Sequence, residues 1–122
     1  MGRELERQLM EEVESRQRSF FDSFDGHRLR GAAIRFNPAA FYNCFFIKWI
    51  PGQTEDNYLL LVDANDLMKF SIDRQSREIV LEDREVMPPR WQARGWGDEG
   101  RMVQKLAREK RAALLKDAAK LA

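Results

Sequence analysis

The chain has 122 residues, of which 43% are hydrophobic and 34% are charged. This length allows one domain that buries roughly two-thirds of its unfolded surface. No apolar run approaches the ~18 to 20 residues of a membrane span, and the charged N-terminus is unlike a secretory signal. Because Cys44 is the one cysteine, no intrachain disulfide can form. We therefore expect a cytoplasmic protein that folds as a single domain over residues 1–122.

The formal net charge is +1, but the charges are unevenly distributed. Residues 87–122 carry nine basic and four acidic side chains, whereas residues 62–86 carry four basic and seven acidic ones. In the simpler interpretation, two parts of one fold attract each other. In the alternative, the basic segment forms a surface for an acidic partner.

The first helix is predicted over residues 3–24, where apolar side chains recur at helical spacing. The main stripe consists of Leu5, Leu9, Val13, Phe20 and Phe24, with Met10 and Phe21 at its edge. Asp25-Gly26 then provides a C-cap signal. The stripe favours burial in the core, and a face for a partner helix is the alternative.

Two further segments have the composition of strands. Leu29–Phe36 is followed by the Asn37-Pro38 breaker, and its small residues allow close approach of another element. Phe41–Ile50 holds five aromatics in ten residues, which favours a strand, with a helical turn at Ala39-Ala40 as an alternative start.

The segment Asn57–Asp83 predicts three strands joined by tight turns. Tyr58–Val62 is a continuous apolar run, which indicates burial on both faces or a central position in the sheet. Met68, Phe70 and Ile72 alternate with polar residues, so this strand places one face on the core and the other in water. Ile79–Leu81 returns as the third strand. Because the turns are short, the strands pair antiparallel.

Residues 86–98 are rich in proline and glycine and predict a loop. A helix is predicted to follow over residues 99–120, with Asp98 as its N-cap. The apolar stripe of this helix consists of Val103, Leu106, Ala107, Leu114, Ala118 and Leu121. Its opposite, basic face consists of Arg101, Lys105, Arg108 and Lys116.

These elements predict an α+β fold, in which an antiparallel meander of four to five strands packs against an N-terminal and a C-terminal helix. The strands fall within residues 29–83.

Catalytic and metal-binding patterns are not found in the sequence. His27 is the one histidine, and no third group is placed to orient a pair with Ser23. One cysteine and one histidine cannot build a zinc site. A calcium loop starting at Asp63 lacks the required glycine and glutamate, since Met68 and Arg74 stand there. We expect no cofactor, no metal and no enzyme. The least favoured alternative is an unrecognised carboxylate site among Asp63, Asp66, Asp73, Glu82 and Asp83.

The candidate binding residues begin in the loop, where Arg90, Trp91, Arg94 and Trp96 alternate guanidinium and indole groups. Arginine and tryptophan are the residue types richest in interface hot spots. The same pairing suits single-stranded nucleic acid, in which bases stack on aromatic rings. In a third interpretation, the tryptophans fill the gap between the sheet and the last helix.

We predict a small non-catalytic protein-binding module of the adaptor, inhibitor or toxin-neutralising kind, whose partner is another protein and not a membrane. The alternative is a nucleic-acid-binding protein that uses the basic last helix and the loop. Self-association is left open. The candidate binding residues are Arg90, Trp91, Arg94, Trp96, Arg101, Lys105 and Arg108.

Overall fold

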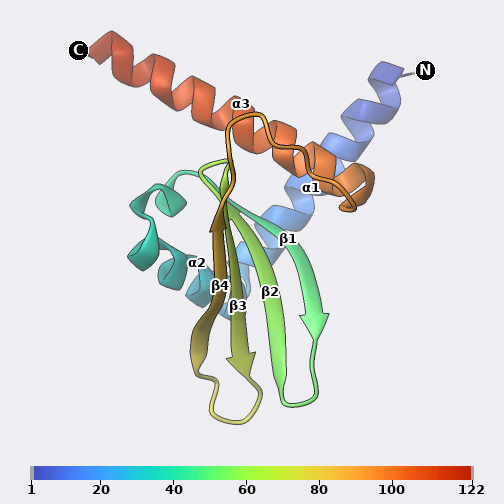
Figure 1. Cartoon of the computed structure of the whole chain (residues 1–122). Helices are drawn as coiled ribbons and strands as arrows, with labels where there is room; N and C mark the ends of the chain where they lie inside the picture. Colours follow the sequence, from blue (N-terminus) through green and yellow to red (C-terminus); the bar gives the residue numbers. More distant parts are fainter. Residues whose placement is uncertain (1, 122) are drawn as a thin grey trace.

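The computed structural model describes residues 2–121, and side chains as far as Lys120. Its elements are, in order, α1 (Gly2–Asp22), α2 (Phe24–Phe36), the 3-10 helix η1 (Pro38–Phe41), β1 (Cys44–Pro51), β2 (Glu55–Val62), β3 (Asp66–Asp73), β4 (Ile79–Val86) and α3 (Gly97–Leu121). The strands form one antiparallel sheet in the order β1-β2-β3-β4 (Figure 1). The predicted α+β class and the four-stranded meander are confirmed. The predicted limits at residues 1 and 122 lie outside the described residues.

The prediction for residues 3–36 was wrong in its second half. The chain forms two helices there, and the predicted strand Leu29–Phe36 is the main part of α2. The break lies at Ser23, which has an extended backbone and whose Oγ accepts a hydrogen bond from the Gly26 N–H at 3.1 Å. Ser23 is therefore the N-cap of α2, and Asp25 lies in the first turn of the new helix.

Gly26 makes this turn sterically feasible. A Cβ atom at this position would lie 1.8 Å from the Phe20 carbonyl oxygen at the end of α1. Only glycine allows the first turn of α2 to approach α1 so closely. The Asp25-Gly26 pair, expected to end a helix, instead lies inside the beginning of one.

Between α2 and the sheet the chain forms the helical turn that was the alternative prediction at Ala39-Ala40. Asn37 caps both α2 and η1, and its Oδ1 accepts a hydrogen bond from the Ala39 N–H at 3.0 Å. β1 consequently begins at Cys44, three residues after the predicted start at Phe41.

The first core lies between α2 and one face of the sheet. It consists of fully buried side chains from α2, β2 and β3: Leu29, Ala33, Leu60, Val62, Met68, Phe70 and Ile72. Phe20 and Phe21 of α1 pack at its margin, together with Ile79 and Leu81 of β4. The predicted inward direction of Met68, Phe70 and Ile72 is therefore confirmed, and Ile79 and Leu81 of β4 face the same core.

A second core lies on the opposite face, which the alternation in β3 had predicted to lie in water. Leu61 of β2 is buried there against Val13 of α1 and Val103 of α3. Ser71 of β3 is also buried on this face, and its Oγ donates a hydrogen bond to Glu82 at 2.7 Å. Helices and the connecting loop thus cover part of both faces, as the apolar run in β2 indicated.

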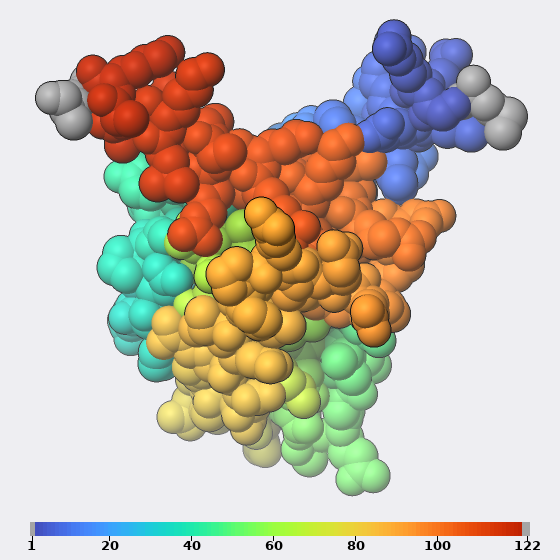
Figure 2. Space-filling view, turned by 45° about the horizontal axis from the view of Figure 1, so that its top comes forward, coloured from blue at the N-terminus to red at the C-terminus, as the bar shows by residue number. Residues whose placement is uncertain are grey.

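α1 and α3 cross at one end of the sheet, and their free ends diverge from it (Figures 1 and 2). Two ion pairs join the helices near the crossing, Arg16 with Glu99 and Lys105 with Glu6. Leu5 is 56% exposed and Leu114 is 39% exposed, so the apolar stripes of both helices continue beyond the core. The Leu121 side chain of the predicted stripe lies outside the described residues. In the described part of the chain, no helix combines the length and hydropathy of a membrane span.

Phe70→Ala should lower the free energy of unfolding by about 3–5 kcal/mol, because it removes a fully buried ring from the first core. Urea titration of both proteins measures this difference. Val80→Ala is the matched control, since Val80 points to the other face and is 45% exposed. Equal effects from the two substitutions would contradict the register of β4.

Candidate functional site

The loop between β4 and α3 is held against the second core by Trp91. Its indole is 8% exposed, packs edge-to-face on Trp96 with ring centroids 5.1 Å apart, and donates a hydrogen bond to the Ala64 carbonyl at 3.2 Å. Buried tryptophan usually finds a partner for its N–H in this way. The interpretation in which the tryptophan fills a gap therefore describes Trp91, and its indole is not available to a partner.

Side chains from α3 hold the same loop. The buried Gln104 donates to the Trp91 carbonyl at 2.8 Å and accepts from the Ala93 N–H at 3.1 Å. Arg108 donates to the same Trp91 carbonyl. Arg108 was expected on a free basic face of the last helix, but part of its bonding capacity stabilises the loop.

The other candidate residues are spread over different surfaces. Arg90 and Arg94 are exposed and Trp96 is half-buried. Arg101 and Lys105 are exposed and form ion pairs with Asp98 and Glu6. The structure brings Arg90 and Arg108 together with Arg111 around a hollow of about 380 Å³, which Pro88 and Leu115 also line. Binding by these residues stays a prediction.

A second surface, which sequence reasoning missed, is the outward side of α2 and η1. We call it the α2 face, and its exposed residues are Phe24, His27, Gly31, Arg35, Phe36, Phe41 and Tyr42. The four aromatic side chains are between 46% and 73% exposed. The Arg28 guanidinium lies 5.5 Å from the centroid of the Phe24 ring. Exposed aromatic rings and arginines along one helix are enriched at protein interfaces.

Two hollows flank the middle of α2 and share Gly31, where an added Cβ would meet no atom within 4 Å. One, of about 270 Å³, lies against Phe41 and is also lined by His27, Arg30 and Ile34. The other, of about 530 Å³, is here called the α2–β4 groove. Its lining residues are Arg28, Gly31, Ala32, Arg35, Phe36, Phe70, Glu78, Ile79 and Leu81. Glycine leaves both hollows open across the helix.

The α2 face was missed because residues 29–36 were assigned to a strand. The sequence did contain a contrary signal. Ile34 is the only β-branched residue between Phe24 and Phe36, whereas leucine, arginine and alanine, all favourable in helices, dominate the segment. Leu29 and Ala33, the buried pair, are also spaced by four residues.

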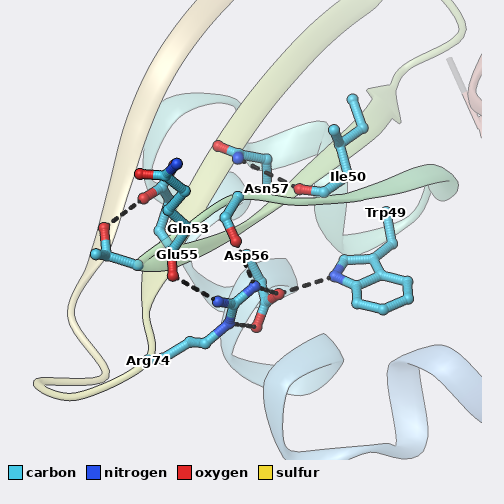
Figure 3. Close-up of polar contacts among 9 residues, drawn as sticks. Trp49, Ile50, Gln53, Glu55, Asp56, Asn57 and Arg74 are labelled. Carbon is cyan, nitrogen blue, oxygen red and sulfur yellow. Dashed lines mark hydrogen bonds and ion pairs between the residues drawn. The ribbon is translucent and has the colours of Figure 1, made fainter.

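A polar cluster at the far end of the sheet is structural (Figure 3). Arg74, in the turn after β3, donates to the carbonyl oxygens of Gly52 and Gln53 at 2.8 and 2.9 Å and to the Asp56 carboxylate at 3.0 Å. The Trp49 indole donates to the same carboxylate at 3.1 Å. The Arg74 hydrogen bond lowers the pKa of Asp56. Arg74 thus ties one hairpin turn to the other.

The acidic residues considered for a carboxylate site lie apart and have structural partners. Asp66 is 2% exposed and accepts from Arg84 and from Asn37, at 2.8 and 3.0 Å. Asp73 caps the following turn by accepting from the Gln75 and Ser76 N–H groups. Within the described residues, no three His, Cys, Asp or Glu side chains gather in a group that could hold a metal ion.

Cys44 lies in the first core and is 8% exposed. Burial raises the pKa of its thiol from 9.0 to about 12, despite the opposing effect of the Arg30 and Lys110 charges. A thiol with this pKa is protonated at neutral pH and is a poor nucleophile. Cys44 therefore acts as a small buried hydrophobic residue.

Comparison with known proteins adds no family assignment. No family model matches the chain, and neither a curated protein nor a solved structure is significantly similar to it. The candidate sites therefore depend on their own geometry.

Trp91→Ala should lower the free energy of unfolding by about 3–5 kcal/mol, because it opens a cavity and leaves the Ala64 carbonyl unpaired. A thermal or urea melt measures the loss. The neighbouring exposed residue supplies the control, since Arg94→Ala should change stability by no more than ~0.5 kcal/mol. A Trp91 variant as stable as the wild type would mean that the loop does not pack as described.

Cys44 should make stability fall with rising pH in a defined window. Between pH 9.0 and about 12 the unfolded thiol loses its proton while the folded thiol keeps it, so folding is disfavoured increasingly through this range. Cys44→Ala removes this dependence. The difference in unfolding free energy between wild type and variant should therefore shrink between about pH 8 and 10.5, measured by urea titration. A constant difference would contradict the buried, protonated thiol.

Proposed function

We propose that this chain is a small, non-catalytic protein-binding module that presents the α2 face to its partner. The observation that carries the proposal is the exposure of four aromatic side chains along α2 and η1, Phe24, Phe36, Phe41 and Tyr42, on either side of two hollows that share Gly31. Exposed aromatic residues cost solubility unless a partner covers them. Aromatic rings and arginine are also the groups that contribute most to interface energy.

The shape of the surface supports the same proposal. The Gly31 position is open, so a partner can approach the α2 backbone closely. Phe41 and Tyr42 pack edge-to-face with their centroids 5.0 Å apart, which restricts both rings before binding. A pre-ordered aromatic pair loses little side-chain entropy on association.

The nucleic-acid alternative receives less support from the same geometry. For nucleic-acid binding, Trp91 would have to stack on bases, but its indole is buried. Arg108 would have to contact phosphates, but it donates a hydrogen bond to the Trp91 carbonyl of the loop. Arg111 near the second hollow donates to the Asp63 carbonyl at 3.3 Å. Exposed Arg90 and Arg94 are the residues through which this alternative would operate.

The test compares the full chain with Phe24→Ser/Phe41→Ser as bait in a lysate of the source organism, with chemical crosslinking. Both rings are more than half exposed, so the variant should fold normally, which circular dichroism checks. A partner identified with the wild type should bind the variant at least about 30-fold more weakly, as hot-spot losses of ~2 kcal/mol imply.

The matched control removes two exposed apolar side chains elsewhere, Leu5→Ser/Leu115→Ser. It should bind the partner like the wild type. Equal retention of the partner by the Phe24/Phe41 variant would overturn the α2 face as the binding surface. Binding to generic duplex DNA that weakens steeply with salt and is lost in Arg90→Glu/Arg94→Glu would instead favour the nucleic-acid alternative.

A further inference from the structure

At the outer edge of β4, the main-chain N–H and C=O groups of two residues, Ile79 and Leu81, point away from the sheet. Asp73 donates its N–H to the Glu78 carbonyl at 3.0 Å, which makes this the hydrogen-bonded pair at the start of the β3–β4 ladder. Antiparallel ladders alternate, so Val80, opposite Ser71, points its N–H and C=O toward β3. Ile79 and Leu81 therefore point theirs outward, away from the sheet.

The other edge of the sheet, β1, is occupied at Phe46. Gln17 of α1 donates from its side-chain amide to the Phe46 carbonyl at 2.8 Å and accepts from the Phe46 N–H at 2.6 Å. This amide substitutes for a neighbouring strand on β1. Within the described residues, no side chain does the same for Ile79 or Leu81. The main chain of β4 at Ile79 and Leu81 can therefore accept a further strand, whereas that of β1 at Phe46 cannot.

The α2–β4 groove runs along this open edge. α2 begins beside the turn that precedes β4, where Asp25 pairs with Arg77. It ends near Asp66, which accepts from Asn37 and lies opposite Val86 at the end of β4. α2 and β4 are consequently parallel, with apolar side chains between them. A hollow of about 530 Å³ lies in the range of ligand pockets.

The groove is positively charged at its rim. Arg28 and Arg35 line it together with a single acid, Glu78. Nη2 of Arg28 donates to the Arg77 carbonyl at 2.8 Å, but Nη1 is buried and has no hydrogen-bond partner in the described part of the chain. An unpaired buried donor on a charged group is costly, and a change of the Arg28 rotamer would let it pair with a carboxylate in the groove.

Only a short stretch of the edge is open. A register shift in the β3–β4 pairing follows Leu81, at the unpaired Glu82, and exposed charges at Asp83, Arg84 and Glu85 continue to the end of the strand. Bulges and charges of this kind discourage strand pairing. The accepting segment is therefore Ile79–Leu81.

From these features we propose that the α2–β4 groove binds an extended peptide segment of a partner protein. The segment adds to β4 at Ile79–Leu81 as a fifth strand, inserts an apolar side chain above Phe70, and places a carboxylate between Arg28 and Arg35. Main-chain bonds supply affinity and the alternate side chains supply specificity, as in other strand-addition complexes. This inference rests on the proposed function and specifies the chemistry of the partner.

The test begins with selection of a phage-displayed library of random decapeptides on the full chain. Enriched sequences should alternate apolar β-forming residues with polar ones and should share an acidic residue. A synthetic peptide of the best sequence is then titrated into ¹⁵N-labelled protein. On saturation, hydrogen exchange of the Ile79 and Leu81 amides should slow by about tenfold or more, because each N–H gains an acceptor. The Val80 amide, bonded within the sheet, is the internal reference.

Three further measurements complete the test. Arg35→Glu should weaken the peptide at least about tenfold, because it reverses a charge at the carboxylate site. Arg94→Glu, an equal change on the distant loop, should leave affinity unchanged. Two N-methylated peptides are compared, one methylated at the odd residues and one at the even residues. Only one of these sets points its N–H groups toward β4, so only that peptide should lose binding.

Failure of the strand-addition proposal is distinguishable from failure of the proposed function. If the peptide or partner requires Phe24 and Phe41 but exchange at Ile79 and Leu81 is unchanged, the α2 face binds and strand addition is wrong. If the enriched peptides are helical, lack acidic residues or bind Arg35→Glu as well as the wild type, the proposal of an extended, acidic peptide in the groove is overturned. If no peptide is enriched, strand addition is overturned.

Discussion

The contact between Gly26 and the end of α1 is the constraint on which the remaining architecture depends. A side chain at this position would overlap the Phe20 carbonyl, and with it the turn at Ser23 could not close. The turn directs α2 along β4, so Leu29 and Ala33 reach the first core. The same turn leaves the opposite side of α2 in solvent. One glycine therefore determines both the packing of the sheet and the orientation of the α2 face.

The two faces of the sheet are covered by different elements and leave different residues exposed. On one face α2 completes the first core and leaves a groove beside β4. On the other face α1, α3 and the loop meet, and Trp91 is used to hold them together. Because Trp91, Gln104 and Arg108 share the bonds that fix the loop, changes there affect folding. The exposed aromatic residues of α2 and the segment after it, Phe24, Phe41 and Tyr42, are left for recognition, whereas exposed Trp49 donates to Asp56.

The meander could be predicted from the sequence because its signals are local and consistent. Phe70 and its neighbours alternate, and the turns are short and polar. Residues 29–36 could not be assigned so simply, because their leucine, arginine and alanine favour a helix while Gly31 does not, and the decisive contact lies outside the segment, between Gly26 and Phe20. Composition also cannot distinguish a tryptophan that binds from one that packs. The burial of Trp91 depends on Ala64 and Gln104, which are distant in sequence.

The amide of Gln17 has a consequence for how this protein can assemble with itself. Fibre growth by strand pairing needs two free edges per molecule, one to accept and one to offer. Here Gln17 occupies the main chain of β1 at Phe46, so a strand cannot pair with that part of β1 while α1 stays in place. Two copies joined through Ile79–Leu81 of β4 would pair about a two-fold axis, and a third copy could not pair with β1 at Phe46 in the same way. A single glutamine thereby disfavours polymerisation through the two edges of the sheet.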